Sequence, residues 1–340
     1  GFLYPGPVGP DNNSSVVFVT SPATVNYGVV NPADYSQPLH DLSIVIPIMK
    51  TGHYTGGTAA DLVSLVEIPY VPTTPRITDN TVVAQVEDTG AIWATAYQRT
   101  TQTLFTSAIM KRHAGFGSLG IGGIYQVDYS NPDVPVVSPF VDVNTISGIN
   151  VGTDPASHQA LSPNYDGATH DEDSYDAVGK IGIGNIAISD DDTTLWMMNL
   201  NDKTLYEMTV IDANGDVAAP TSAIGHQTVD PGCAAKNGDW RPFALTYHQG
   251  LVYIGGVCSA QNGGTAADLE AYIYTHDPEG ADGNFSLVYN FPLNYPRGWA
   301  NYADGGTQEV NAEWNPWIAS DTQIASPAWN GGPYVSTSYP

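Results

Sequence analysis

Lys and Arg are scarce in this sequence, and three of the phrases that contain them also hold residues suited to ligand binding. Guanidinium groups bind anions through paired hydrogen bonds, and indole rings offer flat faces for stacking. We therefore predict a site for an anionic or sugar-like ligand. Its residues would be Arg112, His113, Trp240, Arg241, Arg297 and Trp299. In the alternative interpretation, each Arg pairs with a carboxylate and packs on its neighbouring Trp.

The acidic stretch at residues 166–176 is a second candidate site. Ca²⁺ takes six to eight oxygen ligands, and carboxylates at alternating positions can turn towards one ion. The predicted ligands are Asp166, Asp171, Asp173 and Asp176, and Ca²⁺ is the one cofactor that the sequence suggests. The alternative is a solvated acidic loop without metal.

The two cysteines, Cys233 and Cys258, can form only one intramolecular bridge. In an oxidising compartment this bridge would close a loop of roughly 25 residues and contribute about 3 kcal/mol. The alternative is two separate buried thiols. The chain lacks the GxSxG, HExxH and GK[ST] motifs, so no catalytic residue is predicted.

The segments that would position the candidate site residues are predicted to be short strands. Apolar segments of four to eight residues alternate with Gly, Pro, Asn and Asp, while helical periodicity is nearly absent. A strand–turn–strand pattern recurs at residues 93–109, 186–208 and 243–255. Such meanders predict an all-β fold, a β-propeller with six or seven blades. A sandwich or jelly roll is the alternative.

We predict one propeller domain over residues 1–340, with a Gly/Pro-rich lead-in at 1–14 and an irregular segment at 295–340. No closing strand–turn–strand unit follows residue 294, so the ring is expected to be incompletely closed or completed by an N-terminal strand. No apolar run reaches the roughly 18 residues of a membrane span. No positively charged leader with an apolar core starts at residue 1, so we expect any signal peptide to have been removed already.

The charge balance limits the partners. The net charge is −25, yet charged residues make up 13% of the chain, whereas about a quarter is typical. The imbalance is therefore a shortage of base rather than an excess of acid. It argues against nucleic acid and anionic membranes as partners, because phosphates require a basic surface. The low Lys content and the abundance of Gly and Tyr favour a secreted protein.

Several phrases resemble the β-propeller region of large secreted bacterial surface proteins, the type often followed by SdrD-like B-repeat modules. The phrases lie at residues 111–117, 178–189, 239–243, 251–260 and 291–299. The resemblance implies a secreted or cell-surface propeller with a structural or adhesive role.

The sequence is compatible with two alternative functions. The first is a non-enzymatic surface, adhesive or assembly module, whose partners would be copies of itself, other extracellular proteins or glycans. The second is a Ca²⁺-dependent hydrolase of the lactonase or phytase kind, in which acidic loops would gather at the propeller mouth.

Overall fold

The computed structural model describes residues 4–5, 29–30, 43–69, 80–167, 169–280, 285–295, 298–301, 309–312 and 314–318. The chain divides into two compact units, Gly1–Ile46 with Glu67–Thr81 and Pro47–Val66 with Val82–Pro340. The second unit contains the candidate site. Arg297 and the side chain of Trp299 lie outside the described residues. The single-domain organisation stays a prediction.

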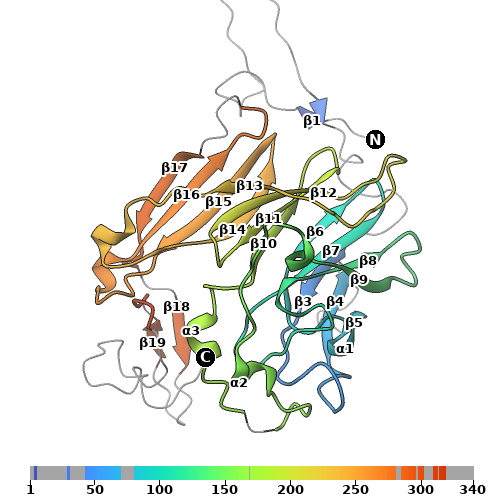
Figure 1. Cartoon of the computed structure of the whole chain (residues 1–340), viewed down its shortest axis with the longest axis horizontal. Helices are drawn as coiled ribbons and strands as arrows, with labels where there is room; N and C mark the ends of the chain where they lie inside the picture. The colour runs from blue at the N-terminus through green and yellow to red at the C-terminus, as the bar shows by residue number, and fades with distance from the viewer. Residues whose placement is uncertain are drawn as a thin grey trace, which may run out of the picture. The chain divides into compact units, whose positions relative to one another are not determined.

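Three sheets of the second unit are four-stranded antiparallel meanders, with strands in sequence order (Figure 1). The first contains β6 (Ile92–Gln98), β7 (Thr103–Ala108), β8 (Gly123–Asp128) and β9 (Val136–Asp142). The second contains β10 (Ile183–Ile188), β11 (Thr194–Asn199), β12 (Thr204–Thr209) and β13 (Ile224–Gln227). The third contains β14 (Trp240–His248), β15 (Leu251–Cys258), β16 (Glu270–His276) and β17 (Phe285–Pro292).

The other elements are shorter or belong to smaller sheets. A three-stranded sheet has the order β3 (Ser43–Pro47), β4 (Val63–Pro69) and β5 (Thr81–Gln85). Two-stranded sheets join β1 (Tyr4–Pro5) to β2 (Val29–Val30) and β18 (Gly298–Asn301) to β19 (Glu309–Ala312). The α-helices are α1 (Val86–Thr89), α2 (Ala156–Gln159) and α3 (Ser174–Ala177). The 3₁₀ turns are η2 (Gly120–Gly122), η3 (Val143–Thr145), η4 (Cys233–Lys236) and η5 (Ala266–Asp268).

Strand β11 shows how the sequence builds the core, because nearly all its residues are buried. Successive side chains of a strand point to opposite faces of the sheet. Leu195 and Met197 enter a core shared with β6–β9, while Trp196 and Met198 enter a second core shared with β14 and β15. The continuous apolar run Leu-Trp-Met-Met therefore fits a strand packed between two neighbouring sheets.

The first strands of the three meanders lie beside one another, since β10 contacts both β6 and β14 (Figure 1). The prediction of an all-β chain with few helices is confirmed. The number of blades stays a prediction. The strand analysis missed β9 and β13, the fourth strands of their sheets. Pro139 and Gly225 interrupt these edge strands, and both residues weaken strand signals.

The predicted disulfide is confirmed. Cys233 and Cys258 are bonded, their Cα atoms are 5.1 Å apart, and both residues are fully buried. They pack in one cluster with Trp240, Tyr272 and Tyr274. The bridge therefore ties η4 to the end of β15 through an aromatic core. In the described part of the chain, no helix is long and apolar enough to span a membrane.

Candidate binding site

A cavity of about 980 Å³ lies against the third four-stranded sheet. Its wall is largely apolar, and several segments of the chain contribute to it. Strands β14–β17 supply Phe243, Ala244, Gly255, Gly256, Val257, Ala271, Tyr272, Ile273 and Phe291. The segment after β7 supplies residues 109–113, and the region of α3 supplies residues 175, 176 and 178–180.

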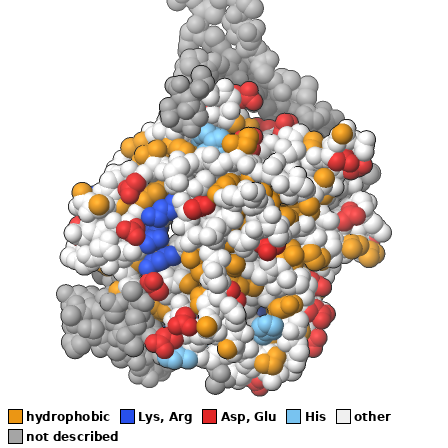
Figure 2. Space-filling model, in the orientation of Figure 1, with side chains coloured by type: hydrophobic (Ala, Val, Ile, Leu, Met, Phe, Trp, Pro, Cys, Tyr) orange, Lys and Arg blue, Asp and Glu red, His pale blue; other side chains and the backbone are white. Residues whose placement is uncertain are grey.

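Four of the ten basic residues of the chain line this cavity, namely Lys111, Arg112, Lys180 and Arg241. Figure 2 shows Lys and Arg side chains gathered in one stripe, with Asp and Glu side chains beside it. The cations come from three segments that are distant in sequence. Their meeting concentrates basic side chains at one place in a chain with a net charge of −25.

Arg241, on β14, is held by polar neighbours on one side of its guanidinium group. Its Nη2 donates to Asp239 Oδ2 at 2.8 Å and to Gln261 Oε1 at 3.1 Å. Its Nε is buried and has no acceptor among the described residues. Burial lowers the pKa of Arg241, while the charge of Asp239 acts in the opposite direction. The group stays charged at neutral pH, because a guanidinium is not deprotonated in proteins.

Arg112 fastens the segment after β7 to the acidic loop. Its Nε donates to the Asp171 carbonyl at 3.2 Å and its Nη2 to the His170 carbonyl at 2.8 Å. The guanidinium carbon lies 5.3 Å from the centre of the Tyr175 ring. These contacts fix the position and direction of the guanidinium group at the cavity wall.

Lys180 pairs with Asp176, four residues earlier, and its side chain is 15% exposed. The exposed fraction of the Asp176 side chain is 49%. An exposed carboxylate holds its partner loosely, because solvent screens the attraction. The pair therefore positions the ammonium group at the cavity wall, where a ligand can still contact it.

His113 adds a neutral polar group to the wall. Burial and the neighbouring Arg112 charge lower its pKa, so the imidazole is uncharged at neutral pH. Its backbone N donates to Asp171 Oδ2 at 2.6 Å, and its Nδ1 lies 2.8 Å from Thr169 Oγ1. Both contacts hold His113 against the acidic loop.

The segment 314–318 closes another part of the wall. The backbone N of Trp317 donates to the Ser259 carbonyl at 3.0 Å. Its ring lies on Gly179, where an added Cβ would be only 2.7 Å from the indole. Trp314 packs on the cluster formed by Ala260, Leu269 and Leu293. Two indoles thus join the cavity wall from a segment distant in sequence.

The structure brings together Arg112, His113 and Arg241 of the predicted ligand site. Trp240 is 1% exposed and lies in the disulfide core, where its Nε1 donates to Thr228 Oγ1 at 3.1 Å. Adjacent residues of β14 point to opposite faces, so Trp240 cannot flank Arg241. The assignment of Trp240 as a stacking face is therefore corrected to a core role. Arg297 and the Trp299 side chain are not described.

Two of the predicted calcium ligands, Asp171 and Asp173, share the partner Ser157. Asp171 accepts hydrogen bonds from His113 and from the hydroxyls of Ser157 and Ser174, and Asp173 accepts from the backbone N of Ser157. Asp176 pairs with Lys180, and Asp166 is exposed. In the part of the chain that the structure describes, no group of three His, Cys, Asp or Glu is arranged to hold a metal. The calcium site stays a prediction.

Sequence reasoning missed Lys180 and Trp317. Lys180 lies in Val178-Gly-Lys-Ile-Gly, a phrase without aromatic neighbours, and Trp317 lies more than 130 residues away from it. The scarcity of Lys and Arg was the signal that could have identified Lys180. Each of the ten Lys and Arg residues could have been treated as a candidate, whatever its flanking residues.

No family model matches the chain. It is 30% identical to Colossin-D of Dictyostelium discoideum over 249 residues, covering 73% of this chain and 24% of the relative. It is 27% identical to Colossin-A of the same organism over 257 residues, covering 73% of this chain and 2% of the relative. The chain thus spans about a quarter or less of these relatives. They come from Dictyostelium, so the bacterial part of the sequence resemblance has no support among them.

Solved structures give weaker similarities. One is the nidogen/laminin complex, with a TM-score of 0.40, 10% identity, and coverage of 80% of this chain and 71% of that chain. Another is the periplasmic gluconolactonase PpgL of Pseudomonas aeruginosa, with a TM-score of 0.33, 13% identity, and coverage of 78% and 59%. Since both TM-scores are below 0.5, the fold described above depends on the strand order and pairing of this chain alone.

Proposed function

We propose that this chain is a β-propeller-type recognition module of a larger secreted protein, and that it binds a ligand in the cationic cavity without transforming it. The observation that carries the proposal is the convergence of four of the ten basic side chains on one largely apolar cavity. Scarce charges held by fixed contacts at a concave site are typical of ligand recognition.

The strand order supports the propeller part of the proposal. Each four-stranded meander has the topology of a propeller blade, and the contacts of β10 with β6 and β14 are those of neighbouring innermost strands. The disulfide supports secretion, because such bonds persist in oxidising compartments. The greater length of the colossins supports a module within a longer chain.

The contacts of the polar groups at the cavity support binding rather than catalysis. Asp176 is paired with Lys180, and the Nδ1 of His113 contacts Thr169. The hydrolase alternative requires carboxylates that converge on one ion. Asp171 and Asp173 instead hold backbone and hydroxyl groups of the neighbouring segments. The contacts therefore favour recognition over the hydrolase.

A binding screen tests the proposal. The wild-type protein would be titrated with a panel of organic and inorganic anions and neutral sugars, with thermal unfolding and calorimetry as readouts and mass spectrometry to detect products. We expect at least one compound to bind saturably, to bind about tenfold more weakly to Lys180→Gln, and to remain chemically unchanged. Lys203→Gln is the matched control, because Lys203 lies outside the cavity wall.

Two results would contradict the proposal. One is a panel in which no compound binds to the folded protein. The other is turnover of a bound compound, which would favour the hydrolase alternative.

A further inference from the structure

We propose that strand β17 is a self-association surface, through which two copies of this chain pair edge to edge as antiparallel strands. The proposal goes beyond ligand recognition and does not depend on what the cavity binds. Two properties of β17 carry it. One is a long edge with little protection against pairing, and the other is the set of side chains that the strand exposes.

β17 is the outermost strand of the third four-stranded sheet (Figure 1). It pairs with β16 on one side, and no strand pairs with its other side in the part of the chain that the structure describes. The backbone N–H and C=O groups along such an edge can pair with another chain. β17 has eight residues, so the edge is longer than that of an average strand.

The fourth strands of the other two sheets are better protected. Native proteins protect sheet edges with short strands, charged residues, Pro or bulges. β13 has four residues, and one of them is Gly225. β9 contains Pro139, which cannot donate a hydrogen bond, and it ends at the charged residue Asp142. Its pairing with β8 also has a register shift.

β17 has fewer of these features. None of its eight residues is charged, and its Pro is the last of them. A bulge that leaves Val288 without an opposite residue in β16 is the feature that it shares with β9. Like charges placed opposite each other destabilise a strand pair. In a chain with a net charge of −25, an uncharged strand avoids that repulsion where two copies would touch.

The exposed side chains of β17 are largely apolar. Leu287, Val288 and Tyr289 are 52%, 53% and 59% exposed. Leu287 pairs with Tyr274 and Tyr289 pairs with Ile273, so these two side chains lie on opposite faces of the sheet. A strand added at this edge would therefore bury apolar surface on both faces, which favours association.

The order of side chains along β17 suits a second copy of the same strand. The exposed triplet Leu287–Tyr289 is flanked by one polar residue on each side, Ser286 and Asn290. A two-fold axis near Val288 would place the triplet of one copy against the triplet of the other. Self-complementary two-fold contacts are the commonest in homo-oligomers, and they close after two copies. The expected assembly is therefore a dimer rather than a fibre.

Sedimentation velocity of the wild-type protein tests the proposal, from micromolar to submillimolar concentrations. A salt concentration of about 0.15 M limits repulsion between the acidic copies to distances of about 8 Å. We expect a reversible monomer–dimer equilibrium with a micromolar dissociation constant, because one strand edge buries less area than a standard interface.

Charged variants at Val288 place the contact. Val288→Lys and Val288→Glu should each weaken dimerisation at least about tenfold, because like charges would meet near the axis. An equimolar mixture of the two variants should dimerise about as well as the wild type, because opposite charges then face each other. Val136→Lys is the matched control, since Val136 is 57% exposed on the edge strand β9. It should dimerise as the wild type does.

Hydrogen exchange of the wild-type protein gives a second measurement that needs no substitution. Amides of β17 should exchange more slowly above the dissociation constant than below it, while amides of β9 and β13 should exchange equally at both concentrations. Circular dichroism and thermal unfolding show whether each variant keeps its fold.

Several results would overturn the proposal. Dimerisation that is unchanged by Val288→Lys, or a mixture that associates no better than either variant alone, would place the contact elsewhere. A wild-type protein that stays monomeric would exclude the second copy. Slow exchange of β17 in that monomer would show that a segment of the same chain covers the edge, and fast exchange would leave the edge to a strand of another protein.

Discussion

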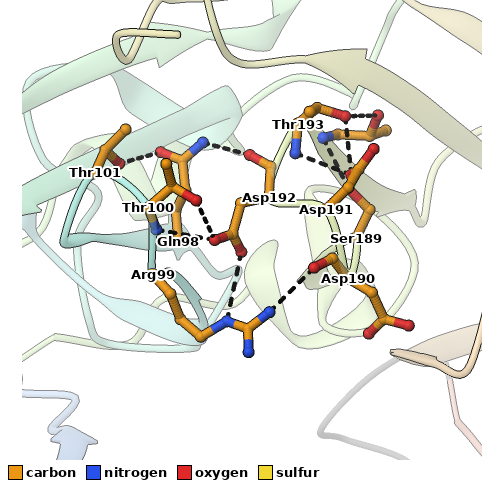
Figure 3. Close-up of polar contacts among 10 residues, drawn as sticks. Gln98, Arg99, Thr100, Thr101, Ser189, Asp190, Asp191, Asp192 and Thr193 are labelled. Atoms are coloured by element: carbon orange, nitrogen blue, oxygen red, sulfur yellow. Dashed lines mark hydrogen bonds and ion pairs between the residues drawn. The ribbon is translucent and has the colours of Figure 1, made fainter. Parts of the chain in front are cut away.

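The carboxylate of Asp192 accepts two hydrogen bonds from Thr100, at 2.9 Å from its backbone N and 2.8 Å from its hydroxyl (Figure 3). Asp192 lies in the turn between β10 and β11, and Thr100 lies in the turn between β6 and β7. The Asp192 carbonyl also accepts from Gln98 Nε2 at 2.6 Å. The turns of two neighbouring sheets are therefore joined by polar contacts, of which the one from Gln98 is buried.

Removal of the Asp192 carboxylate should destabilise this contact between sheets. Asp192 has a φ of +63°, so Asp192→Gly removes the side chain without adding backbone strain. We expect the free energy of unfolding to fall by about 2–4 kcal/mol, because hydrogen bonds to a charged group contribute about 1.5–3 kcal/mol each and are not additive. Urea denaturation measures the change.

Asp192→Asn is the control for that variant. Asn tolerates positive φ and its amide oxygen can still accept from Thr100, so the loss should stay within about 1 kcal/mol. Equal losses for the Gly and Asn variants would show that the carboxylate's contacts with Thr100 contribute little.

Loss of the Cys233–Cys258 bridge should lower stability. The bridge closes a loop with a sequence separation of 25, and replacement of both cysteines by Ala should cost about 3 kcal/mol. The wild-type protein with a reductant should approach the stability of the double variant. The stability of the double variant should not change when the reductant is added. A change would show that the reductant acts on the protein by another route than the bridge.

His158 should make stability depend on pH. Burial alone would lower its pKa, but the hydrogen bond and charge of Asp154 raise it above 6.5. The geometry agrees, since Nδ1 lies 2.7 Å from Asp154 Oδ1 and Nε2 lies 3.0 Å from the Ala114 carbonyl. Both ring nitrogens thus face acceptors, which favours the protonated ring. This contribution is present below pH 6.5 and is lost as pH rises through the raised pKa.

Asp154→Asn measures this contribution. The loss of unfolding free energy relative to the wild type should be larger at about pH 5.5 than at about pH 8.5. The lowered pKa of His113 has the opposite sign, and the comparison between variants removes its effect. Imidazole NMR titration gives the pKa of His158 directly, and a value below 6.5 in the wild type would contradict the assignment.

Gly179→Ala should displace Trp317. Gly179 has a φ of +73°, and an added Cβ would lie 2.7 Å from the indole ring. Gly148→Ala is the matched control, since its φ is +90° and nothing lies within 4 Å of the added Cβ. Both substitutions should cost about 1–2 kcal/mol through backbone strain. Only Gly179→Ala should speed hydrogen exchange at the Trp317 amide, and equal exchange in both variants would show that the ring does not depend on Gly179.

Much of the fold could be predicted because strand signals are local. The run Leu195-Trp-Met-Met and the polar turns around it identified β10–β12 within a few residues. β9 and β13 were missed because edge strands have one partner and tolerate Pro and Gly. The cysteine pair needed no geometry, since two cysteines allow only one bridge.

The site was predicted only in part, because flanking residues are a local signal. Arg112 and Arg241 were selected by their flanking residues, yet Trp240 was assigned to a ligand although strand alternation turns it away from Arg241. Lys180 was missed because its flanking sequence carries no sign of a partner.

The sequence by itself determined the class of fold, the disulfide and the scarcity of base, because periodicity, cysteine count and composition need no knowledge of distant neighbours. Only the tertiary structure decided which of the scarce charges meet. Lys111, Lys180 and Arg241 are separated by about 60–70 residues at each step, and the packing of sheet against sheet brings them to one cavity. The side chains that form the site are therefore a consequence of how the sheets bury their apolar faces.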